Sequence, residues 1–351
     1  MKKLIGICFK IGIVVFALAI ILGKIAMPQQ FTTITNVCKG MYYVYKGDKA
    51  YQKKNLQNAV DYYNKGLELY PNHYGAWFNL GNIYVVYEDY YAAIDSYQKA
   101  FNLKPSFTLA RMNYGIISTE KLGNFDEAIA QYNIIVNSKN KLWTIPFIYN
   151  NKKTEKINKG LAYYNLGLAY RERSIYEENF NPEEAKSDLT KAIEAYQNAI
   201  KILKDNYSIQ YNLALAYHLK GQYQKSGAHY CEAISIEPMN YEAHYNLAIL
   251  LKHLKLYKEA YNEVEKASIL ISQGTNSNTQ SYVFDILNDI SQTLVIQDKY
   301  NYLVEKIDNT TPNNDDITYV NGKIVSTEAL DKAMLENFRT CESKKFFEGK
   351  Q

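Results

Sequence analysis

The chain has 351 residues, of which 47% are hydrophobic and 22% are charged, a composition typical of a folded protein with one or two domains. Its formal net charge of +4 comes from 40 basic and 36 acidic residues. This small excess does not indicate nucleic-acid binding, and no dense Lys/Arg cluster with interleaved aromatic residues is present in the sequence.

The first predicted element is an apolar helix near the N-terminus. Residues 4–23 are interrupted only by Lys10, so the segment is long enough to cross a bilayer. The alternative is a cleaved secretory signal. Such a signal needs small residues at its cleavage site, whereas Ala17-Leu18-Ala19 lies inside the apolar run. We therefore expect residues 1–27 to form a single-pass membrane anchor or, failing that, a signal segment.

Lysines near the start of the chain predict the orientation of this anchor. Lys2, Lys3 and Lys10 favour an N-terminus in the cytoplasm by the positive-inside rule. A linker is expected at 28–39. The domain that follows it is then expected on the outer, extracytoplasmic side of the membrane.

A pattern of aromatic and small residues recurs after the linker. Its clearest copy consists of Trp77, Leu80, Gly81, Tyr84, Ala93, Tyr97, Ala100 and Pro105. The spacings of three, four and seven residues are those of amphipathic helices. They predict one helix at 75–87, a turn at 88–90 and a second helix at 91–103, after which the proline ends the unit.

The same pattern returns at a period of 34 residues. The other copies contain Tyr43, Gly47, Ala59, Tyr63, Gly66 and Pro71; then Leu213, Ala214, Tyr217, Tyr230, Ala233 and Pro238; then Leu247, Ala248, Ala260 and Ala267. At this period the chain resembles the tetratricopeptide repeat (TPR) family. The resemblance implies an all-α solenoid, a right-handed superhelix of helix pairs in which the first helices line the concave face.

Two further copies are altered. One centres on Tyr114-Gly115 and has no closing proline. The other contains Gly167, but its second helix begins late, at Asn181-Pro182, after an acidic loop at 176–179. An insertion at 136–159 separates the two copies. The insertion either forms a loop that contacts a partner or covers a junction between repeats of the solenoid.

Six repeats are therefore expected between residues 40 and 274. Their predicted bounds are 40–73, 74–107, 108–142 with the insertion to 159, 160–206 with its inserted loop, 207–240 and 241–274. Residues 275–308 are expected to add a capping helix pair. Residues 309–351 form a tail in which Asn321-Gly322 predicts a β-hairpin and Ser326 caps a helix at 327–340.

An asparagine recurs two residues before each marker Gly or Ala, on the first helix of the repeat. The five residues are Asn79, Asn113, Asn165, Asn212 and Asn246. An amide both donates and accepts hydrogen bonds, so a regular series could pair with a peptide backbone of any sequence. The other interpretation is that these asparagines support the fold or meet only water.

Large apolar residues directly precede these asparagines. They are Phe78, Met112, Tyr164, Tyr211 and Tyr245. Side chains of this kind anchor protein interfaces. We therefore take Phe78, Tyr164, Tyr211 and Tyr245, together with the five asparagines, as candidate peptide-binding residues on the concave face.

Motifs for catalysis are absent from the sequence. It contains no Gly-rich phosphate loop, nucleophile elbow or HExxH motif. The four cysteines form no CxxC pair and no metal-ligand spacing; they are Cys8, Cys38, Cys231 and Cys341. We therefore expect no enzymatic activity, cofactor, metal ion or small-molecule substrate.

The predicted function is that of a membrane-anchored TPR adaptor or scaffold. It would hold a peptide or helix of a partner protein in its concave groove. The alternative is an assembly component of envelope or secretion machinery that uses its convex face and the insertion.

Overall fold

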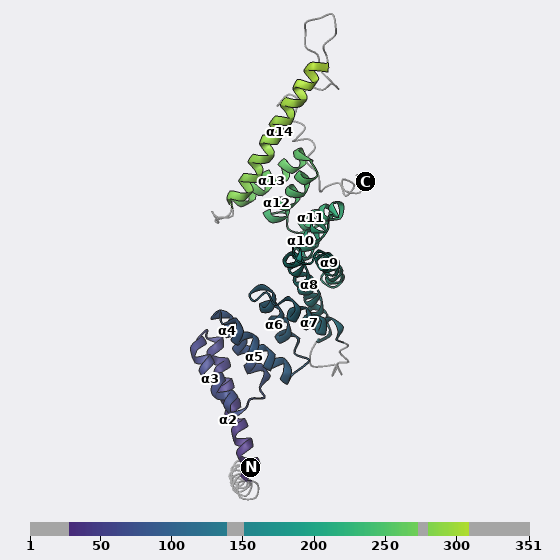
Figure 1. Ribbon diagram of the computed structural model, residues 1–351. Coiled ribbons are helices and arrows are strands. Elements are labelled where there is room, and N and C mark those ends of the chain that lie inside the picture. Colours follow the sequence, from purple (N-terminus) through teal and green to yellow (C-terminus); the bar gives the residue numbers. More distant parts are fainter. Residues whose placement is uncertain (1–27, 139–150, 273–279, 309–351) are drawn as a thin grey trace, which may run out of the picture. The chain divides into compact units, whose positions relative to one another are not determined.

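The computed structural model describes residues 28–138, 151–272 and 280–308, and in these ranges all regular secondary structure is helical (Figure 1). The chain divides into two compact units, Met1–Ile135 and Val136–Gln351. None of the described helices combines the length and apolarity needed to cross a membrane. The expected anchor, the hairpin and the last helix of the tail lie outside the described residues.

Consecutive helices pack against one another in the first unit. They are α2 (Pro28–Gln52), α3 (Leu56–Leu69), α4 (Tyr74–Val86), α5 (Tyr90–Leu103), α6 (Thr108–Glu120) and α7 (Phe125–Asn137). α2 packs on α3 and α4 on α5, and each of these pairs also contacts the following helix. The ends of α4 and the start of α5 each differ from the predicted helices by one residue, and the end of α5 agrees with the prediction.

The turns inside five of the helix pairs share one left-handed residue; the turn between α8 and α9 has none. Lys54, Glu88 and Lys255 have φ near +59°, and Gly123 and Gly221 take the left-handed conformation at equivalent positions. At four of these turns the next backbone N–H bonds the carbonyl five residues earlier, as from Asp89 to Tyr84 at 2.9 Å; after Gly123, the Asn124 N–H bonds the Ser118 carbonyl, six residues earlier, at 2.7 Å. The bond to the carbonyl five residues earlier is the pattern of a Schellman C-cap.

Polar side chains cap the starts of several helices. Asn55, Asp89 and Asn206 each accept a hydrogen bond from the backbone N–H three residues later. Asn181 does the same for α9 (Pro182–Ile202), which has a proline in its first turn as the sequence predicts. Each such cap stabilises its helix by about 1 kcal/mol.

Tyrosine–glycine contacts bring the two helices of a repeat together. A Cβ atom added to Gly81 would lie 2.5 Å from the ring of Tyr97. The same contact joins Gly47 to Tyr63, Gly115 to Tyr132 and Gly167 to Tyr196. These tyrosines are among the largest fully buried side chains, so they form part of the core of each repeat.

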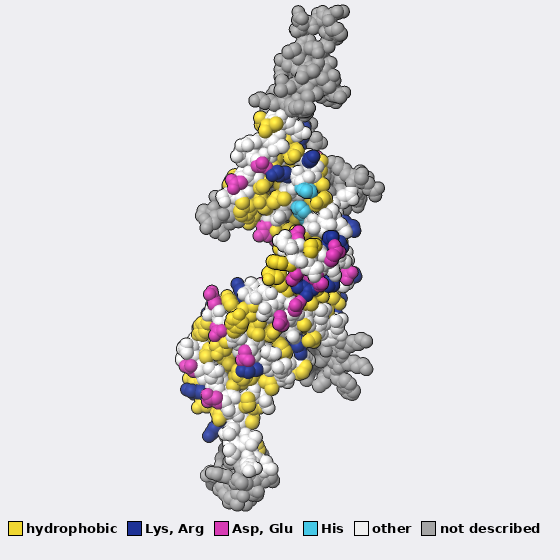
Figure 2. All heavy atoms as spheres, viewed as in Figure 1, with side chains coloured by type: hydrophobic (Ala, Val, Ile, Leu, Met, Phe, Trp, Pro, Cys, Tyr) yellow, Lys and Arg dark blue, Asp and Glu magenta, His cyan; other side chains and the backbone are white. Residues whose placement is uncertain are grey.

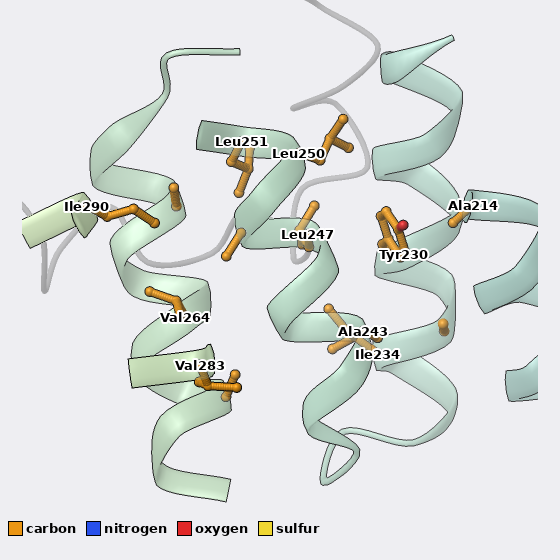
Figure 3. Close-up of a cluster of buried hydrophobic side chains, with 14 of the residues drawn as sticks. Ala214, Tyr230, Ile234, Ala243, Leu247, Leu250, Leu251, Val264, Val283 and Ile290 are labelled. Carbon is orange, nitrogen blue, oxygen red and sulfur yellow. The ribbon is translucent and has the colours of Figure 1, made fainter. Parts of the chain in front are cut away.

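The second unit contains seven described helices. They are α8 (Asn151–Glu177), α9, α10 (Tyr207–Leu219), α11 (Tyr223–Ile236), α12 (Tyr241–His253), α13 (Tyr257–Ser272) and α14 (Gln280–Asp308). α14 packs on α13 through Val283, Ile290 and Leu294, which are buried in one cluster with Leu247 of α12 and Val264 of α13 (Figure 3). α14 thus covers the last repeat.

Four expectations about helix bounds differ from the structure. The predicted capping pair at 275–308 is wrong, because 280–308 form the single helix α14, which contains neither glycine nor proline to interrupt it. The expected linker at 28–39 belongs to α2, and residues 151–159 of the insertion begin α8. The acidic loop is shorter than predicted, since α8 continues to Glu177.

Candidate protein-binding surface

The first asparagine of the series joins two neighbouring repeats. Asn79 of α4 donates from Nδ2 to Asp48 Oδ1 of α2 at 3.2 Å and to the Tyr63 hydroxyl of α3 at 3.0 Å. The Tyr63 hydroxyl in turn donates to Asp48 Oδ1 at 2.8 Å. The three side chains therefore form a closed hydrogen-bonded triad across the seam between the first and second repeats.

An equivalent triad lies one repeat further along the chain. Asn113 Nδ2 donates to Asn82 Oδ1 at 3.1 Å and to the Tyr97 hydroxyl at 3.5 Å. The Tyr97 hydroxyl donates to Asn82 Oδ1 at 2.8 Å. All three positions are displaced by 34 residues from those of the first triad, so the arrangement follows the sequence repeat.

Burial keeps these tyrosine hydroxyls protonated. It raises the pKa of Tyr97 to about 12, although the bond from Asn113 acts in the opposite direction. Burial likewise raises the pKa of Tyr63, and the Asp48 carboxylate that accepts its hydrogen bond raises it further. Both hydroxyls therefore remain hydrogen-bond donors at neutral pH.

The asparagines of the second unit also reach back to the preceding repeat, through a different partner. Asn212 Nδ2 donates to the Tyr164 hydroxyl at 3.1 Å, and Asn246 Nδ2 to the Tyr211 hydroxyl at 2.8 Å. The same amide groups bond backbone carbonyls four residues earlier in their own helices, at Ser208 and Glu242. Asn165 is half-buried in α8.

Arg171 distinguishes Asn212 from the other asparagines. Its guanidinium donates to Asn212 Oδ1 and also to the carboxylate of Glu172. Asn212 is 7% exposed, whereas Asn79, Asn113 and Asn246 are half-buried. Both polar atoms of the Asn212 amide are therefore engaged within the protein.

The large residues before the asparagines pack against neighbouring rings. Phe78 meets Phe107 edge-on with ring centroids 4.9 Å apart, and Tyr245 meets Tyr282 in the same way at 4.9 Å. Tyr211 stacks on Tyr207 at 5.7 Å. Met112 is buried, and Tyr164 lies 6.0 Å from Tyr196. Much of the area expected to face a partner is therefore used within the solenoid.

Sequence reasoning did not identify Asp48, Asn82 or Arg171 as partners of the asparagines. A signal existed for the first two, because they directly follow the marker glycines of the first two repeats. The later repeats carry apolar residues at that position: Ile116, Leu168, Leu215 and Ile249. A polar residue at this position predicts the triad. An apolar residue predicts the arrangement of the second unit, in which the asparagine donates to a tyrosine hydroxyl of the preceding repeat.

Apolar side chains remain exposed on both units, and Figure 2 shows them among the charged residues of the visible face. Phe180 is 77% exposed and Tyr91 76% exposed. In the described ranges no group of three or more His, Cys, Asp or Glu side chains could hold a metal ion. The described surface therefore offers apolar and amide contacts.

Comparison with known proteins identifies the repeats. Tetratricopeptide repeat models match residues 42–73, 74–107 and 207–240, and a TPR repeat model matches residues 185–221. A stretch of 212 residues is 24% identical to TPR repeat-containing protein MJ1428 of Methanocaldococcus jannaschii, covering 51% of this chain and 35% of that protein. A stretch of 150 residues is 25% identical to Superkiller complex protein 3 of Homo sapiens, covering 38% of this chain and 9% of that protein. The chain thus spans only a minor part of these two curated relatives.

A solved structure supports the same fold. It is that of PilW, described as a widely conserved type IV pilus biogenesis factor, with a TM-score of 0.51 and 14% identity. The similarity covers 68% of this chain and 97% of the PilW chain. The chain therefore contains tetratricopeptide repeats arranged as an all-α solenoid, the architecture of a protein-interaction module.

Proposed function

We propose that the chain is an adaptor that holds a peptide or helix of a partner protein through partly exposed asparagine amides, with Asn79 and Asn113 acting in the first unit and Asn246 in the second. One observation carries this proposal. Each of these amides uses Nδ2 for a bond to the preceding repeat, while no described residue donates to its Oδ1. The three side chains are half-buried, so each is partly accessible to a ligand.

The internal bonds prepare these acceptors for a ligand. A side chain already held by its neighbours loses little conformational freedom when it binds, which favours affinity. An amide oxygen can accept a hydrogen bond from any backbone N–H, so recognition would depend weakly on the sequence of the peptide. Asn212 is left out of this set because Arg171 occupies its oxygen.

We further propose that residues 1–27 anchor the adaptor in a membrane, with the repeats on the extracytoplasmic side. The apolar run at 4–23 and the lysines before and within it support this assignment. The measurement is carbonate extraction of membranes followed by protease accessibility of the repeats in intact cells. Release by carbonate, or repeats protected from external protease, would contradict it.

The peptide-binding role is tested with the full chain purified in detergent. A variant with Asn79→Ala, Asn113→Ala and Asn246→Ala is compared with the wild type in capturing partners from native lysate. The expected result is that the variant loses a specific partner protein. A peptide from that partner should then bind the wild type more tightly than the variant in calorimetry.

A matched control tests whether the loss of binding depends on where the asparagines lie or follows from replacing any exposed asparagine. Asn64 and Asn102 are exposed on the second helices α3 and α5. Replacing both with alanine should leave capture and peptide affinity unchanged. Equal loss in the control, or unchanged binding in the triple variant, would contradict the assignment.

A second candidate is an assembly role that uses another surface. Tyr176 near the end of α8 and Phe180 after it are 62% and 77% exposed, with ring centroids 6.0 Å apart. An exposed aromatic pair of this kind fits a protein contact. If Phe180→Ser or deletion of residues 139–150 removes the captured partner while the asparagine variant retains it, this second function is favoured.

A further inference from the structure

A hydrogen bond at the start of α4 depends on the charge of a histidine. The backbone N–H of Ala76 donates to His73 Nδ1 at 3.0 Å. A ring nitrogen accepts a hydrogen bond only when it carries no proton, so the ring is neutral and has its proton on Nε2. The bond therefore specifies both the charge and the tautomer of His73.

The equivalent helices of later repeats begin on side chains that do not titrate. His73 lies 34 residues before Phe107, which makes no side-chain cap bond, and Asn206 lies 34 residues before Asn240. The amide oxygens of Asn206 and Asn240 accept from backbone N–H groups of their own helices at 3.1 and 3.2 Å. Among the side-chain caps of the described helices, α4 alone uses a histidine.

Neighbouring groups hold the His73 ring in this position. A Cβ atom added to Gly75 would lie 3.3 Å from Cε1 and 3.6 Å from Nδ1 of His73, so the ring lies back over the first turn of α4. Tyr70, which follows α3, meets the ring edge-on with centroids 5.9 Å apart, and Tyr74 stacks on it at 6.4 Å. The half-buried ring therefore contacts both α4 and the end of α3.

The charges around His73 offer no compensation for a proton on the ring. Among the described residues, no Asp or Glu forms an ion pair with His73. The charged group beside its aromatic neighbours is a cation, Lys104 at the end of α5, whose Nζ donates to the Tyr74 hydroxyl at 2.9 Å. The N-terminus of a helix also stabilises anions rather than cations. Protonation of His73 therefore gains no ion pair.

A proton on Nδ1 would turn the acceptor into a donor. It would then face the Ala76 N–H, and because two donors cannot bond each other, the ring would have to leave the cap. The same N–H also reaches the His73 carbonyl at 3.1 Å, so the first turn would keep part of its bonding. Histidine takes up a proton near pH 6.5. The bond is therefore present above about pH 6.5 and is lost as the pH falls below it.

We propose that His73 makes the start of α4 a proton-sensitive element, ordered at neutral pH and loosened in mild acid. α4 also carries Asn79, which bonds Asp48 and Tyr63 in the first triad, so acid would act at the junction of the first and second repeats. Because the Ala76 N–H is shared with a carbonyl, the opening equilibrium of the first turn should rise about threefold, near the lower end for loss of a cap.

The test compares the full chain with two variants of residue 73 at about pH 7.5 and about pH 5.5. His73→Asn should keep the cap at both pH values, as Asn206 and Asn240 do, and His73→Ala should lack it at both. Hydrogen exchange of the first turns of α4 is measured by mass spectrometry and expressed as protection factors, which remove the intrinsic effect of pH. The wild type should match the asparagine variant at the higher pH and the alanine variant at the lower pH.

Other histidines also respond to acid, and the comparison separates them from residue 73. Burial lowers the pKa of His218, where His253 acts in the same direction, and burial also lowers the pKa of His229. These residues are identical in the three chains, so a difference between chains at one pH arises from residue 73. Protection of α12 in the second unit should be equal in all three chains and serves as the internal control.

The charge of the ring is read separately by NMR of the full chain with ¹⁵N-labelled histidine. At neutral pH the Nδ1 of His73, assigned by its absence from His73→Asn, should have the shift of a nitrogen without a proton. A proton on Nδ1 at neutral pH would overturn the inference, because the cap could not form. Wild-type protection of α4 that is unchanged in acid, or that falls equally in His73→Asn, would overturn it as well.

Discussion

At the scale of single residues, the recurring asparagines donate hydrogen bonds to side chains of the preceding repeat. Asn79 and Asn113 complete triads with a tyrosine hydroxyl and a polar acceptor of the preceding repeat, and Asn246 reaches a tyrosine by another route. The sequence alone left a structural role and a binding role open. The geometry shows the structural role and leaves one amide oxygen for the proposed ligand.

The first prediction concerns the stability of the Asp48–Tyr63–Asn79 triad. Asn79→Ala and Tyr63→Phe each remove hydrogen bonds that span the seam, so each should lower the free energy of unfolding by about 1 kcal/mol. Urea denaturation followed by circular dichroism measures the change. Asn64→Ala, at an exposed position of α3, is the control and should have no effect. A triad variant as stable as the wild type would show that the bonds contribute nothing.

The buried tyrosines also predict a dependence on alkaline pH. A pKa of about 12 for Tyr97 exceeds the unfolded value of about 10, so folding favours the protonated hydroxyl. The resulting stability is fully present below about pH 10 and is lost as the pH rises toward the folded pKa. Urea unfolding between pH 8 and pH 11 should therefore show falling stability, with a shallower decline for Tyr97→Phe. An identical decline in the variant would contradict the burial argument.

At the scale of helices, the glycine–tyrosine contact sets how closely the two helices of a repeat approach. Gly81→Ala would place a methyl group 2.5 Å from the Tyr97 ring, and the resulting overpacking should cost about 1–3 kcal/mol. Gly75→Ala in the same helix meets only the His73 ring edge at 3.3 Å and should be close to neutral. Thermal unfolding of the two variants gives the comparison. Equal effects would mean that the tyrosine can move aside.

The long pair α8 and α9 depends on a buried ion pair. Arg173 donates from Nε and from its terminal nitrogen to the two oxygens of Asp188, at 2.6 and 2.8 Å, and Asp188 is fully buried. Arg173→Ala should cost about 3 kcal/mol because it leaves the buried carboxylate without its main partner. Lys99→Ala, which breaks the exposed pair with Asp95, should cost less than about 0.5 kcal/mol. Similar losses of unfolding free energy in the two variants, measured by chemical denaturation, would contradict this prediction.

Helix bounds were predictable where the signals were local. The caps at Asp89 and Asn181 and the recurring small residues identify α4, α5 and α9 to within a few residues. The continuity of α14 was missed, although its sequence contains neither glycine nor proline to interrupt a helix. The partners of the asparagines were also missed, because they depend on how one repeat stacks on the next.

At the scale of the whole molecule, contacts among the described helices run mainly between consecutive helices. In such a solenoid, stability is a sum of repeat and neighbour terms, so damage stays local. Gly81→Ala should therefore raise amide hydrogen exchange in α4, α5 and the adjoining helices of the first unit. Exchange in α12 and α13 should stay at the wild-type rate. Mass spectrometry resolves these segments, and a uniform rise over both units would contradict local coupling.

The central claim is that the same asparagines support the solenoid and present an amide oxygen to a partner. It is tested most directly by comparing two double variants. One carries Asn79→Ala and Asn113→Ala, and the other carries Tyr63→Phe and Tyr97→Phe. Both break the triads, but only the first removes the amide oxygens. Affinity for the captured partner peptide, measured by calorimetry, should fall only in the asparagine variant, although both are destabilised. Equal affinity in both variants would show that the asparagines serve the fold alone.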